Sequence, residues 1–142
     1  MPHYVREMTT RTYRGKPPAP IRGPDDALKV LRPRFKDQRR EMFLVVLLNA
    51  RHEVLGGETV SVGSLNASIV HPREVFRPAI LHSAAAIILA HNHPSGDAEP
   101  SEEDLSITKR LVQVGEMHGI AVLDHLIVAK RGLVSLRARQ LL

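Results

Sequence analysis

Apolar residues along the chain gather into short runs whose spacing alternates between the patterns of β-strands and α-helices. Continuous apolar runs bounded by turn residues are typical of strands that are covered on both faces. Five strands are expected, at 41–48, 54–62, 85–90, 120–129 and 133–136. Apolar positions at helical spacing predict three helices, at 24–31, 72–82 and 101–118. Because strands and helices alternate, we expect an α/β fold: a single layered domain with a mixed β-sheet flanked by helices.

Proline and glycine mark where this regular structure should be disturbed or ended. Pro78 lies inside the second expected helix and should kink it, because proline cannot donate a backbone hydrogen bond. Gly56 and Gly57 should form a β-bulge in the second strand. Gly119 suits the left-handed position that ends a helix and should end the third one.

Basic residues are concentrated at the start of the chain. Residues 1–40 hold 11 of the 20 Lys and Arg residues and 4 of the 15 acidic residues, a net charge of +7, whereas residues 41–142 have a net charge of −2. Residues 1–23 also hold four of the ten prolines and are expected to form a basic, proline-rich arm ahead of a domain at 24–142. Such an arm could bind nucleic acid or be a solvated leader, and the sequence leaves both open.

The chain has no cysteine, which excludes disulfides and thiolate metal ligands and fits a reducing compartment. No apolar run approaches the roughly 20 residues that span a bilayer. The first residues also lack the apolar core of a signal peptide. A cytoplasmic protein with no membrane partner is therefore expected.

The residues that point to chemistry lie between His91 and Asp104. His91 and His93 are two residues apart at the end of an expected strand, so their imidazoles project to the same side. A turn and the start of the next helix then bring Asp104 back toward them. Two histidines and a carboxylate suit one Zn²⁺ per chain with a fourth position for water, whereas Mg²⁺ and Ca²⁺ prefer oxygen ligands. Bound zinc lowers the pKa of its water to about 7.

Each of these residues also has an ordinary structural interpretation. A His-x-His pair is often incidental, and Asp104 could simply favour the positive end of a helix dipole. Ser101 and Asp104 together resemble a capping box. The joint pattern favours the metal site: a histidine pair at a strand end, a Pro-Ser-Gly turn, and then Ser-x-x-Asp.

This joint pattern resembles the metal motif of the JAB/MPN⁺ (JAMM) metalloproteases, which is His-x-His, seven residues and Ser-x-x-Asp. Three stretches are similar to the RadC-type branch of that superfamily: His-Asn-His-Pro-Ser-Gly, the preceding Ala-Ala-Ala-Ile-Ile-Leu-Ala and the later Leu-Asp-His-Leu-Ile-Val at 123–128. The resemblance covers about residues 24–142. It implies that the metal is held by His91, His93 and Asp104.

By the same resemblance, Ser101 helps to stabilise a developing oxyanion, and Glu41 takes a proton from the metal-activated water and returns it to the leaving amine. Residue type alone would not select Glu41 over Glu53 or Glu58. A carboxylate at the head of a buried strand does lie at the rim of the sheet, where a site can form. The implied function is zinc-dependent hydrolysis of a peptide, amide or isopeptide bond in a protein or peptide substrate.

Two other functions stay open at this point. RadC-type proteins have been associated with DNA repair, so the alternative is a DNA-binding protein that uses the basic residues 1–40. Against it, aromatic residues make up only 4% of the chain and offer little for stacking on single strands. RadC-type proteins also commonly carry an N-terminal helix-hairpin-helix region, for which this chain has no room. The third hypothesis is a metal-stabilised scaffold, which would need neither Glu41 nor Ser101.

Two related zinc chemistries are excluded. Nucleobase deaminases have a similar α/β layout, but their zinc site needs Pro-Cys-x-x-Cys, and this chain has no cysteine. His52-Glu53 begins like the His-Glu-x-x-His motif of zinc peptidases, but Gly56 occupies the position of the second histidine. His125, within an expected strand, is interpreted as a structural histidine, and support of the metal site from behind is the alternative.

Overall fold

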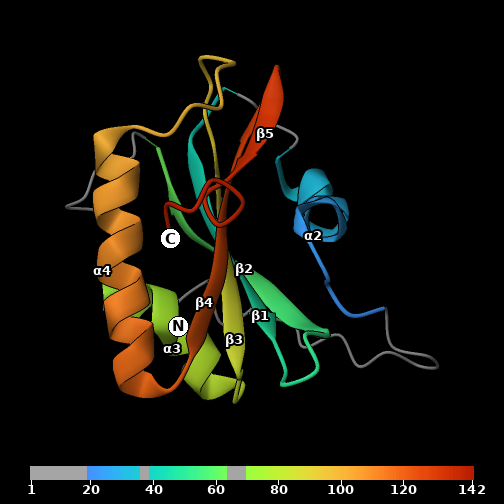
Figure 1. Ribbon diagram of the computed structural model, residues 1–142, viewed down its shortest axis with the longest axis vertical. Helices are drawn as coiled ribbons and strands as arrows, with labels where there is room; N and C mark the ends of the chain where they lie inside the picture. The colour runs from blue at the N-terminus through green and yellow to red at the C-terminus, as the bar shows by residue number, and fades with distance from the viewer. Residues whose placement is uncertain (1–18, 36–38, 64–69) are drawn as a thin grey trace.

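The computed structural model describes residues 19–35, 39–63 and 70–142 (Figure 1). A five-stranded sheet in the order β2-β1-β3-β4-β5 forms the centre of the molecule. The strands are β1 (Met42–Leu48), β2 (Val54–Val62), β3 (Ala86–Asn92), β4 (Ala121–Ala129) and β5 (Gly132–Ser135). The helices are α2 (Pro24–Leu31), the short 3₁₀ helix η1 (Arg32–Phe35), α3 (Pro72–Leu81) and α4 (Glu102–His118).

The sheet is mixed and has helices on both sides. β1 runs antiparallel to both β2 and β3, β3 and β4 are parallel, and β5 is antiparallel to β4. The parallel pair is connected through α4, as a parallel pair requires a long crossover. Figure 1 shows α3 and α4 on one side of the sheet and α2 on the other. The predicted α/β domain with a mixed sheet flanked by helices is confirmed.

Each face of the sheet buries its own apolar cluster. Toward α3 and α4, odd-numbered residues of β1 and β3 such as Phe43 and Leu89 join Phe76 of α3. Toward α2, even-numbered residues such as Leu44 join Leu31 of α2. A strand that is buried on both faces can be apolar at every position, which explains the continuous apolar runs. Because successive side chains alternate, the position of a residue in a strand decides toward which face of the sheet its side chain points.

All of the predicted elements begin and end within two residues of the observed ones. Gly119 has a left-handed backbone (φ 71°) and ends α4 as predicted. β3 continues to Asn92, two residues beyond the prediction. The polar residues at its end stay in the ladder, since His91 pairs with Phe43 and Asn92 pairs with Val128.

The bulge predicted at Gly56 and Gly57 lies one residue earlier, at Leu55. Both glycines pair regularly with β1, and the register shifts lie beside them, at Leu55 and Val60. A Cβ atom on Gly57 would lie 3.4 Å from the carbonyl oxygen of Val45. That is an ordinary van der Waals distance, so a Cβ atom would fit at this position of the ladder.

Pro78 does not interrupt α3, which is continuous from Pro72 to Leu81. The proline ring is buried. Burial of apolar ring surface offsets the one backbone hydrogen bond that proline cannot donate.

The start of the chain is described only from residue 19. The predicted arm at 1–23 thus falls largely outside the described residues and stays a prediction. Residues 19–23 lead into α2, and the Ile21 N–H donates to the carbonyl oxygen of His52 at 2.9 Å. This bond ties the lead-in segment to the turn between β1 and β2.

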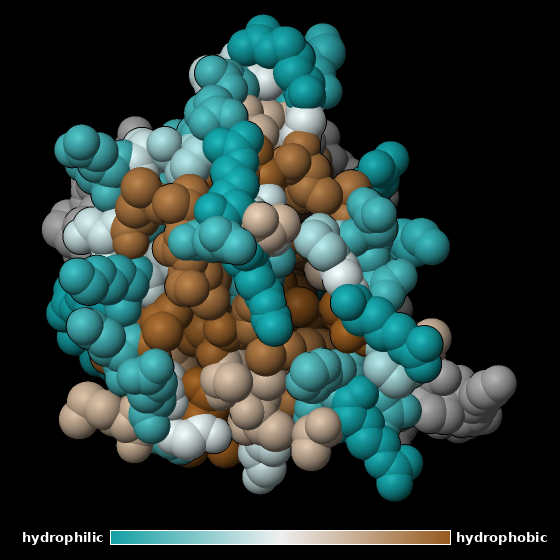
Figure 2. All heavy atoms as spheres, in the orientation of Figure 1, coloured by the Kyte–Doolittle hydropathy of each residue, from teal (hydrophilic) through white to brown (hydrophobic). Residues whose placement is uncertain are grey.

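The outer surface mixes polar and apolar groups. Figure 2 shows hydrophilic side chains around the edge of one face and in a strip down its middle, with apolar surface on both sides of that strip. Among the helices of the described ranges, none combines the length and the apolar character that crossing a membrane would take.

Candidate metal centre

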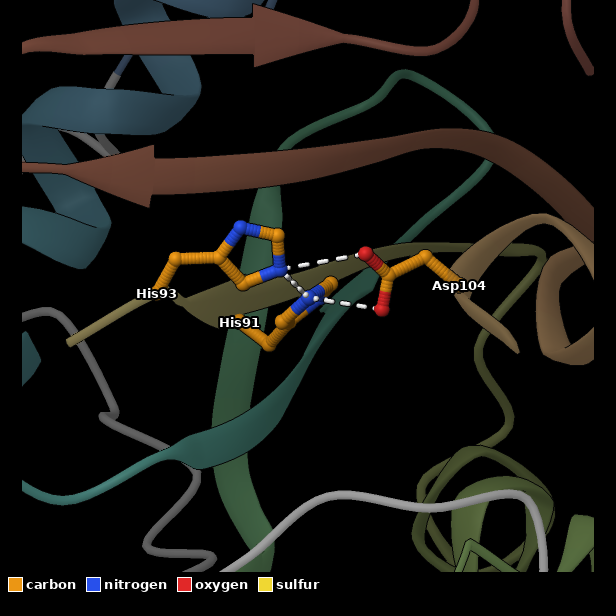
Figure 3. A group of neighbouring side chains, drawn as sticks. All are labelled: His91, His93 and Asp104. Carbon is orange, nitrogen blue, oxygen red and sulfur yellow. Dashed lines mark hydrogen bonds and ion pairs between the residues drawn. The ribbon is translucent and has the colours of Figure 1, made fainter. Parts of the chain in front are cut away.

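The three predicted ligand side chains meet at one end of the sheet (Figure 3). His91 Nε2 lies 3.1 Å from Asp104 Oδ1, and His93 Nε2 lies 3.0 Å from Asp104 Oδ2. The two Nε2 atoms are 2.9 Å apart. One ligand atom from each residue lies within 4.8 Å of the other two. The structure therefore brings together the three residues singled out from the sequence.

The backbone explains why the two histidines face one point. His91 and His93 are separated by one residue at the end of β3, so both project toward the side of the sheet that α4 covers. The chain then turns at Gly96, whose φ of +88° is one that residues with a Cβ rarely adopt. This turn leads into α4, which returns Asp104 to the histidines.

The start of α4 fixes the orientation of the Asp104 carboxylate. Ser101 Oγ accepts a hydrogen bond from the Asp104 N–H (3.1 Å), and Asp104 Oδ2 accepts one from the Ser101 N–H (2.8 Å). This is the capping box that the sequence offered as an alternative interpretation. The two interpretations are compatible, because the same carboxylate caps the helix and faces His91 and His93.

The electrostatics of the cluster favour a cation. Burial alone would raise the pKa of Asp104, but hydrogen bonds with His91 and His93 outweigh it and hold that pKa well below its usual range. The hydrogen bond to Asp104 raises the pKa of His93 above 6.5, against the effect of burial. The Asp97 carbonyl and the charge of Glu41 act in the same upward direction. An ionised carboxylate therefore faces the His93 imidazole, which takes up a positive charge readily.

A chain of hydrogen bonds behind His91 determines which of its nitrogens carries the proton. Thr108 of α4 donates its hydroxyl proton to the carbonyl oxygen of Asp104 (2.7 Å), since a carbonyl only accepts. The Thr108 oxygen then accepts from the Nδ1–H of His125. The His125 Nε2 atom is left to accept from the Nδ1–H of His91, at 2.7 Å. In the neutral imidazole, His91 Nε2 consequently presents a lone pair toward Asp104 and His93.

His93 is oriented in the same way from the opposite side. Its Nδ1 atom lies 2.9 Å from the carbonyl oxygen of Asp97, so the proton is on Nδ1 and the lone pair is on Nε2. Burial lowers the pKa of His125 well below its usual range, which keeps that imidazole neutral. The two Nε2 lone pairs, 2.9 Å apart, repel each other unless a proton or a metal ion lies between them.

A register shift in β4 brings His125 to this face of the sheet. Val122 and Asp124 pair with consecutive residues of β3, so Leu123 is an extra residue, a bulge. Residues three apart in a regular strand lie on opposite faces, but here Val122 and His125 both lie on the α4 side. The direct hydrogen bond between His125 and His91 favours the alternative interpretation of His125, as a residue that supports the cluster from behind.

Glu41 lies just before β1, at the rim of the sheet beside the cluster. It is half-buried, and its charge contributes to the raised pKa of His93. Asn92 holds the backbone on both sides of Glu41. The Asn92 side chain accepts from the Met42 N–H and donates to the Arg40 carbonyl, both at 2.7 Å. Asn92 is itself 0% exposed, so this attachment is shielded from water.

The other two glutamates considered from the sequence lie elsewhere. Glu53 accepts a hydrogen bond from Asn49 (2.9 Å) in the turn at the opposite end of β1. Glu58 is buried within β2, where it pairs with Val45. Of these three glutamates, Glu41 is the one whose charge acts on His93.

The donor set and its dimensions fit a tetrahedral metal ion. Zinc bonds of about 2.0–2.1 Å to nitrogen and oxygen put neighbouring ligands of a tetrahedron roughly 3.3 Å apart. The two Nε2 atoms are 2.9 Å apart, and each lies 3.0–3.1 Å from a different oxygen of Asp104, so a small rearrangement of the side chains admits the ion. Two nitrogens and one oxygen suit zinc or a neighbouring transition metal better than Mg²⁺ or Ca²⁺. The cluster can therefore hold a metal ion with one position left for another ligand.

Sequence reasoning missed two of the residues that support this cluster. Thr108 lies four residues after Asp104, on the same side of α4, so helical spacing could have found it. Asn92 lies between the two histidines, and nothing in the local pattern indicates that its amide would reach back to the segment before β1.

Known proteins match this chain over the whole region that contains the cluster. The sequence pattern of the RadC-like JAB domain matches residues 21–141. A UPF0758 protein of Alkaliphilus oremlandii is 51% identical over 122 residues, which is 86% of this chain and 53% of that protein. The UPF0758 protein of Moorella thermoacetica is 54% identical over 122 residues, covering 86% of this chain and 53% of that protein. The UPF0758 protein of Methanosarcina acetivorans is 46% identical over 126 residues, which is 89% of this chain and 55% of that protein.

This chain therefore spans about half the length of these relatives. The match includes every residue of the cluster and the segments from which the resemblance was drawn. The chain belongs to the RadC-like JAB domain family.

Proposed function

We propose that this chain is a zinc-dependent hydrolase that cleaves an amide bond in a peptide or isopeptide linkage. The observation that carries the proposal is the convergence of two imidazole Nε2 lone pairs and one ionised carboxylate on a single point. Three ligands of this kind leave a position for a reacting water, as in catalytic zinc sites. The reaction class follows from the resemblance to the JAB/MPN⁺ metalloproteases.

The residues around the cluster have separate parts in this reaction. A bound zinc ion would supply a Lewis acid and make water acidic enough to react at neutral pH. Glu41 takes the proton of the attacking water and returns it to the leaving nitrogen. Ser101 Oγ already accepts from the Asp104 N–H, so its own O–H is left to donate to the oxygen on which negative charge develops.

Metal content and hydrolysis test the proposal together. Purified protein should hold about one zinc per chain by mass spectrometry and should cleave members of a panel of fluorogenic peptide and isopeptide substrates. Glu41→Gln should keep the zinc and slow hydrolysis about 10²–10⁴-fold, as expected when a general base is removed. Glu103→Gln, the same change at an exposed residue of the first turn of α4, is the matched control and should keep both. No zinc uptake, or a rate that Glu41→Gln leaves unchanged, would overturn the proposal.

DNA binding through the basic residues 1–40 stays the alternative, and its support is the charge of that segment. If this segment contacts phosphates, affinity for duplex DNA should fall steeply with salt concentration, and deletion of residues 1–18 should reduce that salt dependence. Equal affinity and equal salt dependence after the deletion would contradict this function for the arm.

A further inference from the structure

A second concave region lies on the face of the sheet opposite the metal cluster. A cavity of about 760 Å³ opens between the segment before α2, the β1–β2 turn and the turn after β5. Its wall on the sheet includes Ile88 and Leu123, which belong to the α2 side. The cavity and the cluster thus share β3 and β4 but open on different faces. Its volume is within the roughly 300–1,000 Å³ of small-molecule sites.

Three arginines line this cavity: Arg22, Arg51 and Arg137. All three are exposed, and within the described ranges none of them forms an ion pair with a carboxylate. The Arg137 guanidinium donates to the carbonyl oxygen of Leu123 (3.3 Å), which leaves its charge uncompensated. Positive charges gathered at one concavity attract an anion.

Among the described residues that line the cavity, Asp124 is the one carboxylate, and its oxygens already accept hydrogen bonds within the protein. It is 8% exposed and accepts from the His125 N–H (2.7 Å), the Ser135 hydroxyl (2.6 Å) and the Arg137 N–H (3.1 Å). These bonds attach the turn that carries Arg137 to β4. Asp124 therefore holds one wall of the cavity in place, and the three guanidinium groups stay available to a ligand.

Apolar side chains complete the cavity. They come from Ile21, Ala27, Ile88 and Leu123. An inorganic anion would leave this apolar surface uncovered, and a wholly apolar ligand would leave the arginines without a partner. A ligand that carries an anionic group on an apolar or aromatic body matches both features. Phosphate suits the anionic group, because it carries up to two negative charges and accepts paired hydrogen bonds from arginine.

We propose that this cavity binds a small organic phosphate of mononucleotide size. Its phosphate lies at Arg22, Arg51 and Arg137, and its flat apolar part lies against Ile88 and Leu123. Pro20 also lines the cavity, and the sequence that precedes it, residues 1–18, carries four Lys and Arg residues and one Glu. The site shares no residue with the proposed hydrolase and stands whether or not that activity is found.

Calorimetric titration of the full chain with adenosine 5′-monophosphate tests the site. Saturable binding of one molecule per chain is expected, with a Kd in the micromolar to millimolar range. Adenosine and inorganic phosphate each offer one half of the ligand and should bind at least about tenfold more weakly. A nucleotide that shows no saturation up to about 10 mM would overturn the proposal. Binding to duplex DNA without binding to the nucleotide would overturn it too, because it would indicate a surface for polyanions.

Two pairs of substitutions locate the binding. Arg22→Ala with Arg51→Ala should weaken nucleotide binding at least about tenfold. The backbone N–H groups of Arg22 and Arg51 donate hydrogen bonds to the side chains of Asp26 and Asn49. These bonds do not involve the guanidinium groups, so the double variant should keep its unfolding temperature. The matched control removes two exposed arginines from α3 and α4, across the sheet: Arg73→Ala with Arg110→Ala. Unchanged affinity in the first double variant, or equal losses in both, would place the ligand elsewhere.

Discussion

The two faces of the sheet carry two different kinds of polar site, although β3 and β4 contribute to both. On the α3 and α4 side, the polar groups are buried and bonded to one another, from Thr108 through His125 to His91. On the α2 side, arginines stand exposed around an open cavity. A buried network holds its members in one geometry and tolerates little change. Exposed charges are screened by water and salt, so substitutions among them change the protein less. Variants at the two faces should therefore differ sharply.

The largest effect is expected from removing a predicted ligand. His91→Ala or Asp104→Ala should weaken zinc binding by more than the about 100-fold that outer partners typically contribute, because each change leaves two ligands. Arg51→Ala, on the α2 face, is the control and should leave zinc affinity unchanged. Competition titration with a zinc chelator measures all three. A loss of zinc affinity in Arg51→Ala would show that the two faces are coupled and would contradict the expected difference between them.

The second largest effect is expected at Thr108, which is not one of the three predicted ligands. Thr108→Val keeps the shape of the side chain but leaves the buried His125 Nδ1–H without its acceptor. Zinc affinity should fall about 10–100-fold, and the free energy of unfolding of the metal-free protein should fall by about 1–3 kcal/mol.

Thr108→Ser keeps the hydroxyl and should restore zinc affinity. The ¹⁵N chemical shifts of His91 report its tautomer directly, and a mixture of tautomers is expected in the valine variant. A valine variant with the parent's zinc affinity and a single His91 tautomer would show that the network is structural only.

A smaller and more selective effect is expected at Asn92. Asn92→Ala leaves the Met42 N–H and the Arg40 carbonyl without their partner, which should lower the free energy of unfolding by about 1–3 kcal/mol. Hydrolysis should slow because Glu41 is no longer held, while zinc content stays at about one per chain. Asn49→Ala, a matched amide at the other end of β1, should leave the rate unchanged. Zinc loss in Asn92→Ala would mean that this residue acts on the histidines and not on Glu41.

The smallest effect is expected from pH. In the metal-free protein, His93 has a raised pKa, so its contribution to stability is complete below about pH 6.5 and is lost as pH rises through the higher folded value. Asp104 has a lowered pKa, so its contribution is present above about pH 3.8 and is lost as pH falls from there toward the folded value. Stability from this pair should therefore be greatest between these limits.

Zinc binding has the opposite dependence on His93, because the proton must leave before the metal binds. Zinc affinity should rise as pH increases through the pKa of His93. An NMR titration of the metal-free protein measures that pKa, and Asp104→Asn should lower it by removing the carboxylate. An unchanged value in Asp104→Asn would show that the carboxylate is not the main cause of the shift.

Local patterns were sufficient to predict the strands and helices and the three candidate ligands. The strand Val54–Val62, the helix Pro24–Leu31 and the helix end at Gly119 all lie where the apolar spacing and the turn residues predicted them. The convergence of His91 and His93 could also be predicted, since it depends only on alternation at a strand end. Glu41 came from the family resemblance, because no local pattern separates it from Glu53.

The sequence by itself therefore determined the order of strands and helices along the chain and the short segment that holds the three predicted ligands. The tertiary structure decided what surrounds them. The bulge at Leu123 depends on how β4 pairs with β3, and it alone turns His125 toward the metal side. Arg22, Arg51 and Arg137 meet at one cavity only because the turns that carry them come together at the same end of the sheet. Spacing along a chain reports periodicity within one element, whereas register and the contacts between distant segments follow from the packing energy of the whole domain.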